Sequence, residues 1–300
     1  MTTDLLEHFS VRVRGGLPVY GITVDRLAAP LVARQYRADE RVNLYSAAKT
    51  FTSLAVGIAR DEGLLDLDDR ALDLLPAPAR RPSAEASDVT VAHLLTMTPG
   101  HEHTLFTDEE LRSDDILGDF WAGPFVAEPG TRFHYSSACS YVLGRIVEHR
   151  SGEPLRDYLD QRLFGPLGIW NPLWASCPRG HTWGGTGLHL TTREFARLGA
   201  LLLRRGHVDG RRLVSEEWVD LMASATVDSS GWTPDVEGRR YGLHVWLCTP
   251  PGAYRADGRY GQHCVVLPEH AAAVTVTAHH EGDTHEILRA VWDDLLPSLG

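Results

Sequence analysis

The sequence predicts an α/β protein in which both ends of the chain build one lobe and the middle forms a second, mainly helical lobe. Apolar and β-branched residues alternate in strand-like patterns within the first forty residues, and such patterns return only after residue 240. Between about residues 66 and 212 the pattern becomes helical, with loops punctuated by proline. Strands at both ends with helices between them favour an antiparallel sheet flanked by helices, with the helical lobe inserted.

The N-terminal region is expected to be a pair of strands followed by a helix. Valines at 11, 13, 19 and 24 lie on either side of Gly15-Gly16, which suggests a hairpin turn. After Ser46, apolar residues recur with helical spacing, and Gly63 is well placed to end that helix. The residues that carry this spacing are Phe51, Leu54, Ala55 and Ile58.

The C-terminal region predicts three strands and a closing helix. The strands are expected near Tyr241–Leu247, Gln262–Leu267 and Ala272–Ala278, and the amphipathic helix around Thr284–Leu296. No internal repeat or low-complexity linker divides the chain. We therefore expect one catalytic domain over residues 1–300, with an α/β lobe of about 1–65 and 213–300 and a helical lobe of about 66–212.

Composition narrows the classes of function. Apolar content of 43% and charged content of 23% are those of a globular protein. The net charge of -11 and the absence of a basic block argue against nucleic acid or a membrane as the main partner. The first eight residues do not resemble a secretory signal, and the four cysteines lack metal-binding spacing. These features predict a reduced, cytoplasmic setting.

The most informative residue is the single lysine. Of 29 basic residues, 28 are arginine, and the one lysine lies in Ser46-Ala47-Ala48-Lys49. Arginine stays protonated at any usable pH, whereas a buried lysine can lose its proton and act as a base. A serine three residues earlier supplies the hydroxyl that such a base activates. Ser46 and Lys49 are therefore the candidate nucleophile and base of a serine hydrolase.

The local sequence supports this pairing. Residues i and i+3 share one face of a helix, so the two side chains can meet. At the helix N-terminus the macrodipole also favours negative charge on the Ser46 oxygen. The pKa of Lys49 must fall from about 10.4 to about 7, a change of roughly 4 kcal/mol that burial can supply. The apolar neighbours of Lys49 indicate such burial.

Two further segments complete a recognisable set of motifs. The first is Glu128–Ser137, which contains Tyr135-Ser136-Ser137 and leads into an apolar helix; the second is Gly258-Arg259-Tyr260-Gly261-Gln262, which leads into a strand. With Ser46-Ala47-Ala48-Lys49 they resemble the serine β-lactamase and DD-peptidase-like hydrolases, in particular the class C β-lactamase and esterase branch with its penicillin-binding-protein-like fold. Residues 93–100 and 184–197 also resemble segments of that family, so the similarity covers nearly the whole chain.

The resemblance implies roles for individual residues. Ser46 corresponds to the nucleophile and Lys49 to the base. Tyr135 corresponds to the tyrosine of a Y-x-N motif, which passes the proton towards the leaving group. A phenolate would require strong cationic help, because the reference pKa of tyrosine is about 10, whereas a neutral relay would require much less. The sequence leaves both forms of Tyr135 open.

The same resemblance places a third motif at Ala256-Asp257-Gly258. It implies an oxyanion hole formed by the backbone N–H groups of Ser46 and Arg259. Asp257, Gly258 and Arg259, together with Ser137 of the second motif, are then the candidate substrate-binding residues.

Two positions depart from the family pattern. Ser137 replaces the asparagine of Y-x-N, and Ala256 replaces a lysine or histidine that helps to hold substrate carboxylates. Arg255 or Arg259 is the candidate replacement for that cation. The departure at Ala256 favours esters or uncharged amides over β-lactams and D-alanyl peptides.

We therefore expect a serine hydrolase that acts through an acyl-enzyme on a small ester or amide, without cofactor or metal, and acyl transfer is a variant of this chemistry. One alternative is a β-lactamase or D-amino-acid peptidase, and another is an inactive relative that only binds an acyl donor or a partner. The polar segment His279–Glu286 lacks the spacing of a helical metal motif. Trp121, Trp183 and Trp246 are candidates for the wall of an acyl pocket. The oligomeric state is left open.

Overall fold

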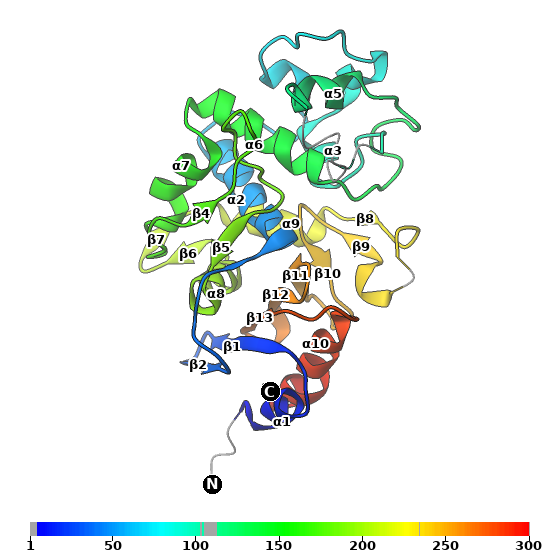
Figure 1. Cartoon of the computed structure of the whole chain (residues 1–300). Coiled ribbons are helices and arrows are strands. Elements are labelled where there is room, and N and C mark those ends of the chain that lie inside the picture. Colours follow the sequence, from blue (N-terminus) through cyan, green and yellow to red (C-terminus); the bar gives the residue numbers. More distant parts are fainter. Residues whose placement is uncertain (1–4, 103, 105–112, 234, 300) are drawn as a thin grey trace.

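A computed structural model describes residues 5–102, 104, 113–233 and 235–299 of the chain. It has an antiparallel sheet with helices on both faces and a helical lobe at one end of this sheet (Figure 1). The fold class expected from the sequence is therefore confirmed.

The main sheet joins the two ends of the chain. Its strand order is β2-β1-β13-β12-β11-β10-β9-β8, and β1 pairs with β13, the last strand in the sequence. The strands are β1 (Val19–Arg26), β2 (Ala29–Gln35), β8 (Val227–Asp228), β9 (Arg240–Tyr241), β10 (Trp246–Leu247), β11 (Tyr254–Gly258), β12 (Gln262–Leu267) and β13 (Ala272–Ala278). The central strands β12 and β13 are buried along their whole length, as expected for a sheet that is covered on both faces.

Helices cover the sheet on two sides. Helix α8 (Thr192–Leu203) packs against β1, β12 and β13 on one face. On the other face lie α1 (Glu7–Arg14) and α10 (His285–Ala290), which are side by side at the lower end of the molecule (Figure 1). Phe9 and Ile287 from these two helices are fully buried in the same hydrophobic cluster. The two chain ends thus share one core.

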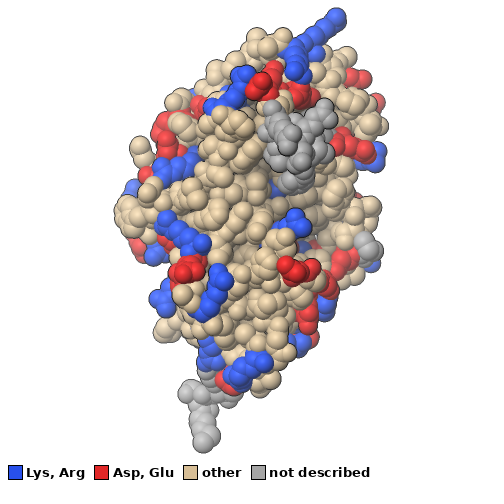
Figure 2. All heavy atoms as spheres, in the orientation of Figure 1, with Lys and Arg blue, Asp and Glu red and all other residues tan. Residues whose placement is uncertain are grey.

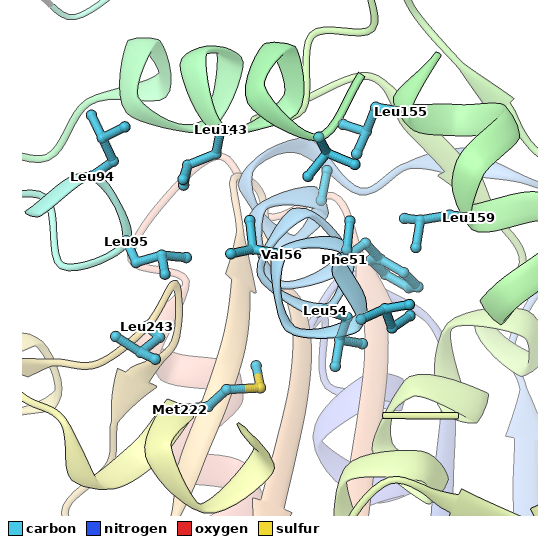
Figure 3. Close-up of a cluster of buried hydrophobic side chains, with 14 of the residues drawn as sticks. Phe51, Leu54, Val56, Leu94, Leu95, Leu143, Leu155, Leu159, Met222 and Leu243 are labelled. Atoms are coloured by element: carbon cyan, nitrogen blue, oxygen red, sulfur yellow. The ribbon is translucent and has the colours of Figure 1, made fainter. Parts of the chain in front are cut away.

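The helical lobe is built around α2 (Ala48–Asp61), whose residues from Ala48 to Ala59 are all buried. Apolar side chains from α2 meet leucines of the surrounding helices on several sides (Figure 3). The helices around it are α3 (Val91–Leu95), α5 (Ile116–Ala122), α6 (Ser137–Ser151), α7 (Leu155–Leu159) and α9 (Glu216–Ser224). In the described part of the chain, none of the helices has the length and apolar character needed to cross a membrane.

Two small sheets complete the chain. The first has the order β3-β5-β4, and the second is a two-stranded ribbon of β6 and β7. Their bounds are β3 (Val42–Asn43), β4 (Leu173–Trp174), β5 (Leu188–Leu190), β6 (His207–Val208) and β7 (Arg211–Arg212). Strand β3 leads directly to Ser46, so its pairing with β5 holds the chain just before the candidate nucleophile.

The prediction of a hairpin around Gly15-Gly16 is wrong. Residues 7–14 form α1, and Gly15 caps the end of this helix. Leu6 and Phe9 are buried, Val13 is partly buried against the same core and Val11 is exposed, so the segment does not have the alternating burial of a strand. The hairpin lies further along the chain, where a two-residue loop joins β1 and β2.

The C-terminal predictions are confirmed for two strands and modified for the remaining elements. Gln262–Leu267 and Ala272–Ala278 are strands with the predicted bounds. The segment 241–247 contains parts of β9 and β10 with a turn between them, in which His244 has a φ of +60°. The last helix extends over α10 and continues as a π-helical turn, η7 (Val291–Leu295).

Candidate active site

Ser46 lies in η1 (Tyr45–Ala47), a single 3₁₀ turn that continues into α2. The chain turns sharply just before it, because Tyr45 has a φ of +48° and its N–H donates to Asn43 Oδ1 at 2.8 Å. Ser46 opens onto a pocket of about 210 Å³. The other residues that line the pocket are Tyr135, Trp232, Thr233, Gly238, Trp246, Arg255, Asp257, Arg259 and His285.

Lys49 is buried directly behind Ser46, with only 1% of its surface exposed. Its Nζ lies 3.0 Å from Ser46 Oγ, 2.9 Å from Ser137 Oγ and 2.9 Å from the carbonyl oxygen of Gly185. Burial lowers the pKa of Lys49 to about 7, and only the weak influence of the Cys139 thiol opposes this shift. The expected contact between serine and lysine is present, and the lowered pKa makes the unprotonated amine accessible near neutral pH.

The three contacts orient the unprotonated amine. The Gly185 carbonyl can only accept a hydrogen bond, and the Ser137 hydroxyl is also able to accept one. When both N–H groups of the neutral amine are donated in this way, its lone pair is left for the Ser46 hydroxyl. Ser137 is buried at the first turn of α6 and is not among the pocket residues, so its observed contact is with Lys49. A direct role of Ser137 in substrate binding stays a prediction.

Tyr135, which precedes α6 in the chain, also lines the pocket. Lys49 Nζ lies 4.9 Å from the centre of the Tyr135 ring. Burial raises the pKa of Tyr135 well above its ordinary value, although hydrogen bonds with Ser46 and Trp246 partly offset this effect. These surroundings favour a neutral phenol over a phenolate, which addresses the alternative that the sequence left open.

A buried histidine that the sequence did not indicate lies near the lysine. His244 Nδ1 donates to the carbonyl of Leu95 at 2.8 Å, and its Nε2 lies 2.9 Å from Ser140 Oγ. Burial first, and then the charge of Lys49, lower the pKa of His244 to about 3. The ring is therefore neutral at pH 7 and adds no positive charge beside the lysine.

Strand β11 brings the third motif to the pocket. A Cβ at Gly258 would lie 2.1 Å from the Leu44 carbonyl oxygen, so only glycine allows β11 to approach the turn that holds Ser46 this closely. Arg259, the next residue, lines the same pocket as Ser46. The alternation of the strand turns Asp257 towards the pocket, whereas Ala256 is buried in the core with 1% exposure.

Arg255 is held by carboxylates of the protein itself. This side chain is 2% exposed, and its Nε donates to Asp257 Oδ2 at 2.6 Å. One of its terminal nitrogens donates to the backbone carbonyl of Glu237 at 2.9 Å and lies 3.8 Å from the Glu237 carboxylate. Arg255 therefore does not replace the missing cation at Ala256, which leaves Arg259 as the candidate from the sequence.

Long-range packing supplies the remaining wall. Trp246 lines the pocket as predicted, whereas Trp121 is buried in the core. Trp232 and His285, which the sequence did not indicate, come from a loop after β8 and from the start of α10. They carry no motif that could have identified them.

Within the described residues, one group resembles a metal-ligand set. It contains Asp235, Asp283 and His285. His285 is paired with Asp235, and Asp283 is paired with Arg289 at 2.7 Å.

The fold and the serine–lysine arrangement are those of the serine hydrolases with a penicillin-binding-protein-like fold. The chain belongs to the Beta-lactamase family, whose model matches residues 19–295. The resemblance inferred from the motifs is therefore confirmed at the level of the family.

Individual relatives differ in what they are named for. Penicillin-binding protein 4 of Amycolatopsis lactamdurans is 30% identical over 252 residues, which cover 72% of this chain and 65% of the relative. Monacolin J acid methylbutanoyltransferase of Aspergillus terreus is 28% identical over 156 residues, or 44% of this chain and 38% of the relative. A penicillin-binding protein homologue from Pyrococcus abyssi has the same fold, with a TM-score of 0.75, 21% identity and coverage of 99% and 78%. The chain thus spans less than two thirds of the first two relatives.

The buried Arg255 pair generates a stability prediction. Arg255→Met should lower the free energy of unfolding by about 3–5 kcal/mol, because it leaves the Asp257 carboxylate without its buried partner. The double variant Arg255→Met/Asp257→Asn should recover part of this loss. Urea denaturation checks both values.

The matched control is Arg193→Met. The Arg193 side chain is 66% exposed and lies 3.7 Å from Asp39, so its loss should change the free energy of unfolding by less than about 1 kcal/mol. Equal losses in Arg255→Met and Arg193→Met would contradict this view of the Arg255 pair.

Proposed function

We propose that the protein is a serine hydrolase that forms an acyl-enzyme on Ser46, with Lys49 as the base and Tyr135 as a proton relay. The observation that carries this proposal is the contact of 3.0 Å between Lys49 Nζ and Ser46 Oγ, made by a buried lysine whose pKa is about 7. A general base works best when its pKa lies close to the operating pH, and the pKa of Lys49 meets this condition near neutral pH.

Acylation would begin when the Lys49 lone pair accepts the Ser46 proton. The Ser46 oxygen then attacks the substrate carbonyl carbon, and the carbonyl oxygen becomes an oxyanion. The backbone N–H groups of Ser46 and Arg259 are the proposed donors to this oxyanion, and each such donor is worth about 3 kcal/mol in an acyl-transfer enzyme. The close approach of Gly258 to Leu44 supports this assignment, since it keeps β11 next to the Ser46 turn.

The leaving group would receive its proton through Tyr135. The phenol is neutral, it interacts with Ser46, and its ring lies against Lys49 Nζ. It can therefore donate its own proton to the departing oxygen or nitrogen and recover one from the Lys49 ammonium. This sequence restores the neutral base for the second half of the reaction.

Deacylation would repeat these steps with water as the nucleophile. Lys49 takes a proton from the water, which attacks the acyl carbon. The ester bond to Ser46 then breaks, and the Ser46 oxygen takes that proton back from the Lys49 ammonium. A second candidate function is acyl transfer, in which an alcohol replaces water; the relative named a methylbutanoyltransferase favours it. Both functions use one acyl-enzyme and differ only in the acceptor.

The pocket points to a small substrate. Its volume of about 210 Å³ is below the usual range of drug-sized sites, which begins at about 300 Å³. A short-chain ester or amide fits this space better than an extended peptide.

Two alternative functions remain to be compared with this proposal. The similarity to penicillin-binding protein 4 favours a β-lactamase or D-amino-acid peptidase. An inactive relative is disfavoured, because the lowered pKa of Lys49 is suited to a catalytic base. The cytoplasmic setting remains a prediction.

The assignment of Ser46 as the nucleophile can be tested by covalent labelling. A fluorophosphonate should label Ser46 with one adduct per chain, as seen by intact mass and peptide mapping. Ser46→Ala should lose the label and reduce kcat for 4-nitrophenyl acetate by at least about a thousandfold. Ser140→Ala is the matched control, because Ser140 is buried beside His244 and does not line the pocket. Labelling at another serine would refute the assignment of Ser46.

The protonation state of Lys49 can be tested through the pH dependence of catalysis. For 4-nitrophenyl acetate, kcat/KM should rise with pH and reach half of its plateau near pH 7, because the pKa of Lys49 is about 7 and its neutral form is required. Lys49→Arg keeps the charge but cannot release a proton, so it should lose about a hundredfold to ten-thousandfold of kcat/KM, like Lys49→Ala. Near-native activity of Lys49→Arg would exclude Lys49 as the base.

A further inference from the structure

Asp257 presents a negative charge to the pocket. Its side chain is 20% exposed and lines the same pocket as Ser46. Burial opposes ionisation, but the Arg255 guanidinium and the His263 ring outweigh this effect and hold the pKa of Asp257 below its usual range. The carboxylate is therefore ionised throughout the working pH range.

One oxygen of this carboxylate is directed to the protein and the other is available. Arg255 and His263 both approach Oδ2, at 2.6 Å and 3.5 Å. Within residues 5–102, 104, 113–233 and 235–299, no hydrogen bond reaches Oδ1. Asp257 can thus accept a donor from a bound molecule while it keeps its partners.

Charged side chains of both signs surround Asp257, and two of them, Arg255 and Arg259, line the same pocket. The guanidinium of Arg255 is shared between Asp257 and Glu237, and a third carboxylate, Asp235, is paired with His285 at the edge of the pocket. Arg259 is exposed at the pocket, where its guanidinium lies 4.8 Å from the centre of the Tyr260 ring. Arg259 is exposed, so its charge is strongly screened by water. The buried guanidinium of Arg255 is already engaged by Asp257 Oδ2 and Glu237, so the acceptor that this wall offers to a cation is Asp257 Oδ1.

Aromatic rings line the same space. The rings of Trp246 and Tyr135 are stacked at 5.5 Å, and Trp232 lies 6.2 Å from Tyr135 with 45% of its surface exposed. The face of a tryptophan attracts a cation, by about 0.5–1 kcal/mol at exposed sites and about 2 kcal/mol when water is excluded. Asp257, Trp232 and Trp246 line the same pocket, and a carboxylate combined with an aromatic surface is an arrangement that recognises ammonium groups.

We propose that Asp257, Trp232 and Trp246 form a subsite for a cationic group next to Ser46. The substrate class is then an ester or amide that carries an ammonium or quaternary ammonium group within a few bonds of the carbonyl. This inference rests on the proposed function for its chemistry, but the cation subsite can be tested without turnover. The same carboxylate would repel substrates that carry a carboxylate, such as penicillins.

The test compares choline with its neutral isostere 3,3-dimethylbutanol. Both are titrated into the full-length Ser46→Ala variant by calorimetry, so binding is measured whether or not the protein is a hydrolase. Choline should bind at least tenfold more tightly than 3,3-dimethylbutanol. In active enzyme, choline should also inhibit 4-nitrophenyl acetate hydrolysis competitively, with a Ki at least tenfold below that of the alcohol.

Variants separate the subsite from general electrostatics. On the Ser46→Ala background, Asp257→Asn should abolish the preference for choline, whereas Glu269→Gln removes the same charge from an exposed position and should retain it. Trp232→Leu changes an exposed side chain and should reduce the preference several-fold, which keeps the test valid if Asp257→Asn does not fold.

Two outcomes would overturn the proposal: equal affinity for choline and 3,3-dimethylbutanol, or a preference that survives both Asp257→Asn and Trp232→Leu. If the wild-type protein bound choline but did not hydrolyse esters, the hydrolase assignment would be rejected and the cation subsite would stand.

Discussion

The burial of Lys49 is the constraint on which the rest of the site depends. Lowering its pKa from 10.5 to about 7 corresponds to between about 4 and 5 kcal/mol of unfavourable transfer of the charged form. Since the folded pKa lies below the unfolded value, this penalty is complete below pH 7 and disappears as the pH rises towards 10.5. The hydrophobic packing around α2 offsets it. Burial of Lys49 thus lowers the free energy of unfolding and at the same time provides a base that works at neutral pH.

The two buried basic side chains of the site, Lys49 and Arg255, have partners of opposite kinds. Among the described residues, the hydrogen-bond partners of Lys49 are neutral: the hydroxyls of Ser46 and Ser137 and the Gly185 carbonyl. Burial therefore favours loss of its charge. Arg255 cannot give up its charge, and it is surrounded by carboxylates instead. This difference explains why a chain that otherwise uses arginine retains one lysine. It also leaves Asp257 Oδ1 as a free acceptor in the pocket wall, although Arg255 and Arg259 line the same pocket. On the face shown in Figure 2, acidic and basic side chains are interspersed.

Sequence reasoning succeeded where the signal is local. Ser46 lies in the 3₁₀ turn η1 that continues into α2, three residues before Lys49, so their contact follows from the spacing of one helical turn. The segment of α1 differs from the predicted strand because Val11 faces solvent and the helix packs against η7, at the other end of the chain. For the same reason the sequence could not show that Arg255 is neutralised by Glu237 or that Trp232 lines the pocket. These contacts join residues from separate elements, and no short motif records them.

The most direct test of the account is the titration of Lys49 itself. Because the chain contains a single lysine, labelling with ¹³Cε-lysine should give one side-chain resonance, which can be followed by NMR from pH 5 to pH 11. We expect one titration with a midpoint near pH 7, since burial lowers the pKa of Lys49 to about 7. The Lys49→Arg variant, in which the signal is absent, confirms the assignment. A midpoint near the ordinary lysine value of about 10.4 would contradict the central claim that this residue is a poised base.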